Sequence, residues 1–226
     1  MAERSRKADA AGVLQAARAA WVSVPASHRV VRIEGPGGSR VEETWAVRGR
    51  GFRKEIRRDG ELIGVIVRNP RWEFRHDIPG KTVAAWSADL APSHRDPDDE
   101  GLILDREDFE RWARSQRARV AVEGDTIGGR KALKLRLRWP GANGDRGDTA
   151  WFDPDSLRPI RQRTGSIDGT VIDTTIDYPP ADAVADDLLA FAMPRDALLE
   201  VNDPELGRQL YSEGRKVSTP NRGDGR

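Results

Sequence analysis

Hydrophobic residues recur along this chain with two different periods, and the period changes at Pro25. Val13, Leu14, Ala17 and Trp21 follow helical spacing, which predicts an amphipathic helix over residues 8–22. From residue 28 to 89 the period is two, broken by Gly, Pro, Asn and Asp turns. This pattern predicts strands over 28–34, 40–48, 51–58, 61–68, 71–76 and 81–88. Asp59-Gly60 is the firmest hairpin signal, since both central positions of a two-residue turn need positive φ.

The second half of the chain begins with a helix and returns to strands. Asp105 is a suitable N-cap, and we expect the helix to run over residues 105–118. Alternation then predicts strands over 119–123, 130–139, 148–153, 158–166 and 170–178, and a closing segment over 188–201. In 130–139, Leu133, Leu135 and Leu137 alternate with Lys134 and Arg136. One face of this strand should therefore be core and the other should face water.

This order of elements predicts a mainly β (α+β) fold built on an antiparallel sheet. We expect one domain over residues 10–201, between a short N-terminal tail (1–9) and a polar C-terminal tail (202–226).

Composition narrows the possible functions only a little. The 226 residues include 38 Lys and Arg against 37 Asp and Glu, so bulk charge indicates neither nucleic acid nor an anionic membrane as partner. With no Cys, disulfides, thiolate metal sites and thiol nucleophiles are excluded. The first 21 residues lack the apolar run of a signal peptide or membrane anchor, and no later stretch approaches the roughly 18 apolar residues of a membrane span.

Several large aromatic residues fall on strands whose alternate positions are polar. Their side chains should converge on one face and line a cavity for an apolar ligand; the candidates are Trp45, Phe52, Trp72, Phe74, Trp86 and Trp139. The alternative is an ordinary aromatic core, because alternation does not tell whether a face is filled. His76 shares the phase of Trp72, but a lone inward His is more often a hydrogen-bonded core residue than a base. No Ser or Asp spacing near the three His suggests a triad.

Residues 96–107 align with the twelve-residue calcium loop, whose ligands would be Asp96, Asp98, Glu100 and Glu107. Glu100 is longer than the usual residue at its position, and the preceding segment does not read as a helix. An acidic loop leading to the Asp105 cap is the simpler interpretation, and we expect no bound metal or cofactor.

Basic residues alternate on two of the expected strands, and they are Lys134, Arg136, Arg138, Arg161 and Arg163. Such a stripe could contact phosphates. A solvated outer sheet face is the commoner arrangement, and the near-zero net charge favours it. The segment Gly35-Pro36-Gly37-Gly38 lacks the Lys of a phosphate-binding loop and reads as a turn.

Three short motifs in the second half of the chain carry a family resemblance. They are Trp151-Phe152-Asp153-Pro154 followed by Leu157-Arg158-Pro159, the hairpin at Gly169, and Phe191-Ala192-Met193-Pro194. Together with the order of elements, they resemble the LolA-like superfamily over residues 10–201. Its members are periplasmic lipoprotein carriers, related cell-envelope lipoproteins, and sensor domains of MucB- and RseB-type regulators of anti-sigma factors.

The resemblance implies a curved antiparallel sheet that forms an incomplete barrel, with helices covering its concave apolar face. It also implies non-enzymatic binding or sensing of an apolar or acylated ligand, such as a lipid or lipoprotein. The alternative is a protein-interaction or anti-sigma-factor regulatory domain whose core is filled. A hydrolase is a third possibility, for which no nucleophile and base can be paired. The family would place the chain in the periplasm or cell envelope, whereas no export signal is visible in the sequence.

Overall fold

A computed structural model describes residues 10–89, 91, 106–141, 144–165, 168–212 and 217–218. The chain divides into two compact units where the sequence predicted one domain. Unit 1 is drawn from Met1–Val24, Arg29–Ser39 and Asp98–Asp177, and unit 2 from Pro25–His28, Arg40–Pro97 and Tyr178–Arg226. Each unit contains a β-sheet, and the two are described separately below.

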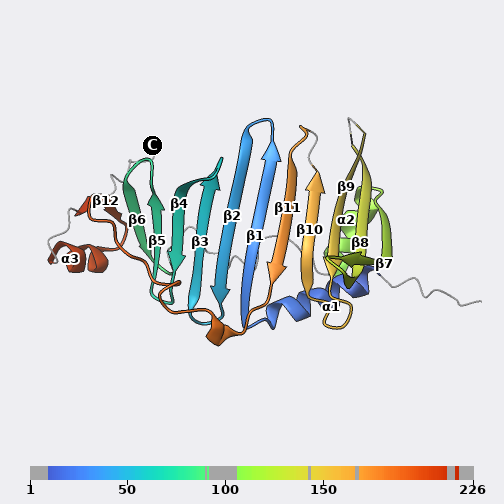
Figure 1. Ribbon diagram of the computed structural model, residues 1–226, viewed down its shortest axis with the longest axis horizontal. Helices are drawn as coiled ribbons and strands as arrows, with labels where there is room; N and C mark the ends of the chain where they lie inside the picture. The colour runs from blue at the N-terminus through green and yellow to red at the C-terminus, as the bar shows by residue number, and fades with distance from the viewer. Residues whose placement is uncertain are drawn as a thin grey trace, which may run out of the picture. The chain divides into compact units, whose positions relative to one another are not determined.

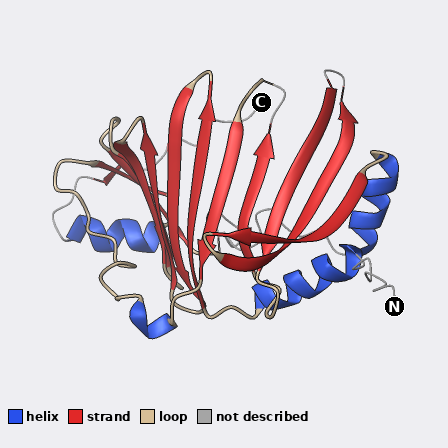
Figure 2. Cartoon of the chain, turned by 45° about the vertical axis from the view of Figure 1, so that its right-hand side comes forward, coloured by secondary structure: helices blue, strands red, loops and turns tan. Residues whose placement is uncertain are grey.

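Unit 1 combines two helices with a sheet whose strand order is β1-β11-β10-β9-β8-β7 (Figure 1). Its elements are α1 (Ala10–Val22), most of β1 (Ala26–Gly35), α2 (Arg106–Ser115), β7 (Arg119–Ile127), β8 (Arg130–Gly141), β9 (Gly144–Phe152), β10 (Pro159–Gly165) and β11 (Val171–Asp177). The pairings from β7 to β11 are all antiparallel. Both helices lie at the end of the sheet formed by β7, β8 and β9 (Figure 2).

The core of unit 1 lies between the two helices and one face of these strands. Leu14 and Ala17 of α1 and Phe109 of α2 pack with Leu135 and Phe152, which are 1% exposed. Leu133 and Leu137 contact the same cluster and are half-buried, so the predicted phase of β8 is correct. The contrast in exposure between the two faces of β8 is weaker than predicted, because the side chain of Lys134, on the opposite face, is only 19% exposed.

Unit 2 contains the strands in the order β13-β12-β6-β5-β4-β3-β2. Its elements are most of β2 (Gly38–Val47), β3 (Gly51–Arg58), β4 (Glu61–Arg68), β5 (Trp72–Asp77), β6 (Thr82–Ser87), a 3-10 turn η2 (Ala181–Ala183), β12 (Leu198–Val201), α3 (Pro204–Ser212) and β13 (Val217–Ser218). The strands from β2 to β6 form an antiparallel meander, which is what short turns between successive strands require.

The turns of this meander follow the sequence signals. Asp59 and Gly60 both have positive φ, at 50° and 88°, as a two-residue hairpin between β3 and β4 demands. At the next turn, the side chain of Asn69 accepts hydrogen bonds from the backbone N–H groups of Arg71 (2.9 Å) and Trp72 (2.7 Å). These local interactions explain why β3 and β4 begin and end at the predicted residues.

The predicted fold class is confirmed: the protein is mainly β, and its antiparallel sheet is open as in an incomplete barrel, with edge strands β7 and β13. Two features differ from the expectation. β12 runs parallel to both β6 and β13, because a long connection after β11 returns the chain to the far edge of unit 2. The tail forms α3, whose Leu206 is 3% exposed against β12 and β6. None of the helices in the described residues has the length and apolar character needed to cross a bilayer.

The packing of unit 1 predicts a large stability difference between two apolar truncations. Leu135→Ala should lower the free energy of unfolding by about 2–5 kcal/mol, because it leaves a cavity in the core. Val22→Ala, at a position 51% exposed at the end of α1, should change it by less than about 0.5 kcal/mol. Urea denaturation followed by tryptophan fluorescence measures both. Equal effects would show that β8 does not form the core of this unit.

Candidate functional site

The register of unit 2 places aromatic and aliphatic residues of five strands on one face. Directly paired positions link Trp45, Arg53, Val67, Phe74, Ala85 and Val201 in one continuous row from β2 to β12. Directly paired residues share a face, so Trp72 and His76, two residues from Phe74 along β5, point the same way. We call this surface the apolar face of unit 2.

Three of the predicted cavity residues lie on this face and three do not. Trp45, Trp72 and Phe74 lie on it, and all three are half-buried. Phe52 and Trp86 belong to the neighbouring row, in which Phe52 pairs with Arg68, Arg68 with Glu73, and Glu73 with Trp86, and they therefore point to the opposite face. Trp139 lies on β8 in unit 1. The expectation that all six side chains share one face is therefore not met.

A long irregular segment, residues 178–197, lies over the apolar face, and we call it the cover segment. It contains the η2 turn and no strand, and Figure 1 shows it (orange to red) passing the ends of β3 to β6 before it enters β12. The rings of Phe191 and Phe74 stack with their centroids 4.8 Å apart and their planes within 3°. Met193 packs in the same cluster, and Val184 and Leu189 pack with Val47. The motif Phe191-Ala192-Met193-Pro194 is thus part of this cover.

Two arginines of the sheet bind the cover segment through its backbone. Arg50, between β2 and β3, donates hydrogen bonds to the carbonyl oxygens of Ala181 and Val184, each at 3.0 Å, and pairs with the Asp186 carboxylate. Arg53 makes a longer contact of 3.5 Å with the carbonyl of Ala190. The first part of the cover segment is therefore held more firmly than the part that carries Phe191 and Met193.

One end of the apolar face is polar. The imidazole of His28 stacks on Trp45 with a centroid distance of 5.0 Å, and its Nε2 lies 2.9 Å from Glu43 Oε1. Glu55 pairs directly with Glu43 across β2 and β3, and it accepts hydrogen bonds from Arg53 and Arg57. Sequence analysis placed His28 at a strand edge and missed this cluster, because its members are brought together only by strand pairing.

His76 lies on the apolar face between Val65 and Val83, as its phase predicted, and it is half-buried. The proposed calcium ligands Asp96, Asp98 and Glu100 lie outside the described residues. Glu107 lies in α2, but its side chain is also outside them. Within the part of the chain that the structure describes, no group of three or more His, Asp or Glu residues is arranged to hold a metal ion.

The predicted basic stripe is real, and part of it is neutralised by acidic neighbours. The five residues share the face of unit 1 opposite the helices, as the register of β8, β9 and β10 requires. Trp151 lies between Lys134 and Arg161, with their cationic groups 5.8 Å and 5.5 Å from its ring centroid. Lys134 pairs with Asp125 at 3.1 Å, and Arg161 pairs with Asp173. The cations at this end of the stripe are therefore half-buried and neutralised by ion pairs, whereas the sequence interpretation expected a solvated face.

The pKa of Asp125 reflects the hydrogen bonds and charges of this network. The indole Nε1 of Trp151 donates a hydrogen bond to its carboxylate at 2.9 Å, and the backbone N–H of Thr126 donates another at 2.8 Å. Together with Lys134, these donors lower the pKa of Asp125 from 3.8 to about 2. A depressed carboxyl pKa stabilises the folded state above the unfolded pKa, and that contribution is lost as pH falls toward the folded value.

We therefore expect Asp125→Asn to remove the part of the acid-induced loss of folding stability that comes from protonation of Asp125. Between about pH 4 and pH 2 the wild-type protein should lose more stability than Asp125→Asn does. Urea midpoints of the two proteins at a series of pH values test this difference. A carboxyl ¹³C titration should also place the midpoint of Asp125 near 2, and a midpoint at the ordinary value would contradict the network.

Comparison with known proteins identifies the fold. No protein-family model and no curated protein matches the sequence. Among solved structures, that of MucB has a TM-score of 0.51 at 17% identity, with 83% of this chain and 64% of that chain covered. An uncharacterized conserved protein from Thermus thermophilus has a TM-score of 0.49 at 12% identity, covering 84% of this chain and 98% of its own. Lipoprotein LppX from Mycobacterium tuberculosis has a TM-score of 0.44 at 15% identity, covering 75% and 95%. The chain has a LolA-like fold, as its motifs and order of elements predicted, and at these identities the likeness extends to the fold alone.

Proposed function

We propose that this protein binds an apolar or acylated ligand, a lipid or the acyl chain of a lipoprotein, on the apolar face of unit 2 without chemical turnover. The observation that supports this most is the pairing of a half-buried aromatic surface with a cover that has no strand hydrogen bonds to hold it. Trp45, Trp72 and Phe74 retain apolar area that a ligand could still remove from water.

The cover segment already acts as an internal apolar ligand for this face. Phe191 stacks on Phe74, and Phe191 and Met193 pack against the same buried cluster as Trp72 and Phe74, through apolar burial worth roughly 25 cal/mol per Å². A ligand that takes their place repeats those contacts and releases the segment from the sheet. The exchange is expected between Leu188 and Ala197, because Arg50 holds the part before it and the Leu198 N–H bonds to the Lys81 carbonyl after it.

Such an exchange would make the protein a sensor as well as a carrier. Release of residues 188–197 changes an exposed surface of the molecule without disturbing the strand ladder from β2 to β6. Segments held by few backbone hydrogen bonds open at low free-energy cost, so ligand binding could shift this equilibrium.

A second function, that of a protein-interaction or regulatory domain with a filled face, is favoured by a different observation. Val184 and Leu189 are only 5% and 7% exposed, so this part of the cover segment is packed as well as a normal core. In this alternative the whole cover segment is permanent structure, and any partner binds elsewhere on the protein.

A fluorescent fatty acid distinguishes these functions. Binding to the apolar face should raise its emission saturably, and Trp72→Ala should weaken binding about tenfold or more, equivalent to roughly 1.4 kcal/mol. Trp86→Ala is the matched control, because Trp86 is a half-buried Trp of the same sheet that points to the opposite face. The absence of saturable binding, or equal weakening by both substitutions, would contradict the proposed site.

Phe191→Ala tests whether the cover segment competes with the ligand. The substitution should lower stability by about 2 kcal/mol, less than the loss for a fully buried Phe, and should strengthen fatty-acid binding because a competing side chain is removed. The two effects are measured by urea denaturation and by the same titration. If the face is permanently filled, Phe191→Ala will lower stability and no binding will be gained.

A further inference from the structure

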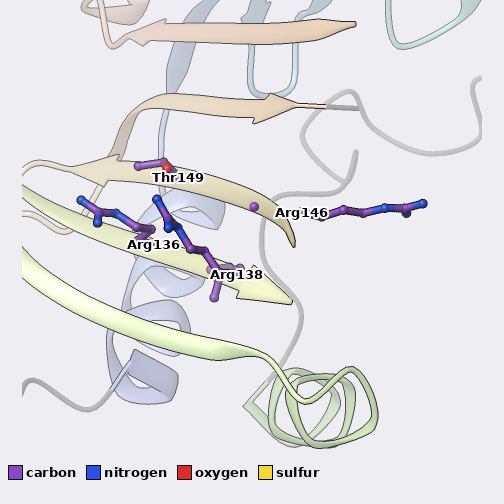
Figure 3. Close-up of a pocket in the computed structure, with 6 residues that line it drawn as sticks. Arg136, Arg138, Arg146 and Thr149 are labelled. Carbon is purple, nitrogen blue, oxygen red and sulfur yellow. The ribbon is translucent and has the colours of Figure 1, made fainter. Parts of the chain in front are cut away.

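The polar face of unit 1 contains a pocket of about 380 Å³ at the end of the basic stripe where, among the described residues, only Arg136 has an acidic partner. It is lined by Arg136, Leu137, Arg138, Arg146, Gly147 and Thr149 (Figure 3). Its size falls within the range of small-molecule sites. It lies between β8 and β9, in a different unit from the apolar face, so its role is independent of the function proposed above.

Strand register explains why a pocket forms here. Arg136 pairs with Thr149 and Arg138 pairs with Gly147 across β8 and β9. Gly147 and Thr149, which have small side chains, therefore lie opposite two long arginine side chains. The space beside the arginines, above Gly147 and Thr149, is left open. At Gly147, a Cβ atom would lie only 2.8 Å from the Leu137 carbonyl oxygen, so the close approach of the two strands requires glycine.

One nearby carboxylate, that of Glu123, neutralises the pocket residue Arg136, and the others are directed elsewhere. Glu123 pairs with Arg136 at 2.7 Å and also contacts Lys134, while Asp173 pairs with Arg161. Asp148 lies between Gly147 and Thr149 in sequence, but it pairs with Leu137 and so belongs to the face that the helices cover. No carboxylate of the described chain forms an ion pair with Arg138, Arg146 or Arg163.

The side chains around the pocket differ in direction. The guanidinium of Arg138 extends toward Thr149, whereas that of Arg146 extends away from both (Figure 3). The Thr149 hydroxyl donates to no other group in the described residues. Arg163 pairs directly with Thr149 from β10 and adds a further cation beside the pocket. The donors that converge are thus the guanidinium group of Arg138 and the hydroxyl of Thr149, while Arg136 lines the pocket with its guanidinium paired to Glu123.

We propose that this pocket binds a phosphate group. A guanidinium presents a planar pair of donors that match two oxygens of a phosphate, and a hydroxyl can serve the third. The pocket exceeds the volume of the anion itself, which leaves room for the group that carries the phosphate. Because net charge is only +1, attraction comes from this local cluster and should weaken with added salt.

The phosphate could belong to a soluble monoester or to the headgroup of an anionic lipid, and two probes separate these sources. Inorganic phosphate and glycerol phosphate are titrated into ¹⁵N-labelled full-length protein, and shifts are expected at amides of β8 and β9 around the pocket. In parallel, vesicles of phosphatidylcholine with and without phosphatidylglycerol are tested by co-sedimentation. Binding of the monoester or of the anionic vesicles supports the site and identifies the source.

Arg138→Gln should weaken phosphate or vesicle binding roughly 10- to 100-fold, the effect of losing hydrogen bonds to a charged group. Thr149→Val should weaken it less. Arg130→Gln is the matched control, because Arg130 is exposed on the same strand and face but outside the pocket. Thermal melts of all three variants should match the wild type, since the substituted groups are not core residues.

Two outcomes would overturn the proposal. Equal loss of binding in Arg138→Gln and Arg130→Gln would show attraction to the general positive charge of the strand. Binding of a single-stranded oligonucleotide, with no response to phosphate, glycerol phosphate or anionic vesicles, would assign the arginines to a nucleic-acid surface. Failure of this site leaves the fatty-acid titration of unit 2 unaffected, because neither Arg138 nor Thr149 belongs to that unit.

Discussion

Strand register is the constraint on which both candidate sites depend. In unit 2, the pairings from β2 to β12 bring Trp45, Val67 and Phe74 into one row, and a shift of one residue in any strand would send its side chains to the other face. The register between β3 and β4 is set by the hairpin at Asp59 and Gly60 together with a β-bulge between Ile56 and Arg57, which shifts the pairing by one residue. In unit 1, the same kind of constraint places two small residues of β9 opposite two arginines of β8.

The cover segment contains no strand of its own, and the sheet beneath it determines its position. Residues 178–197 lack strand pairing, so their position depends on side chains that the sheet already holds in place. Arg50 donates to two part-buried backbone carbonyls of the segment, which would otherwise lack a partner, and it also pairs with the exposed carboxylate of Asp186. Beyond Asp186 the contacts are mainly apolar, and apolar contacts are not directional. This asymmetry is what allows one part of the cover to be fixed and the other to be exchangeable.

Sequence patterns predicted the helices and strands better than they predicted which residues of different strands share a face or come into contact. The strands 51–58 and 61–68 were predicted with their observed ends, because Gly51, the Asp59-Gly60 hairpin and Asn69 are local signals. Phe52 and Trp86 were placed on the wrong face relative to Trp72, since alternation gives the phase within one strand and says nothing about the phase of its neighbour. His28 and Glu43 are 15 residues apart in sequence, and no local pattern could predict their contact. The helix α3 was missed because the mainly polar composition from Asn202 onward indicated a tail, although Leu206 and Leu210 follow helical spacing.

Near-neutral composition conceals how unevenly charge is distributed. The sequence contains 38 basic and 37 acidic side chains, and this balance favoured a fully solvated interpretation of the basic stripe. Around Trp151 the cations are neutralised, because Asp125 pairs with Lys134 and Asp173 pairs with Arg161. Ion pairing is a short-range property, however, and an acidic residue can neutralise only the cations that the register places beside it. At the other end of the same strands the neighbouring positions hold Gly147 and Thr149 in place of carboxylates, and in the described residues Arg138, unlike Arg136, has no acidic partner.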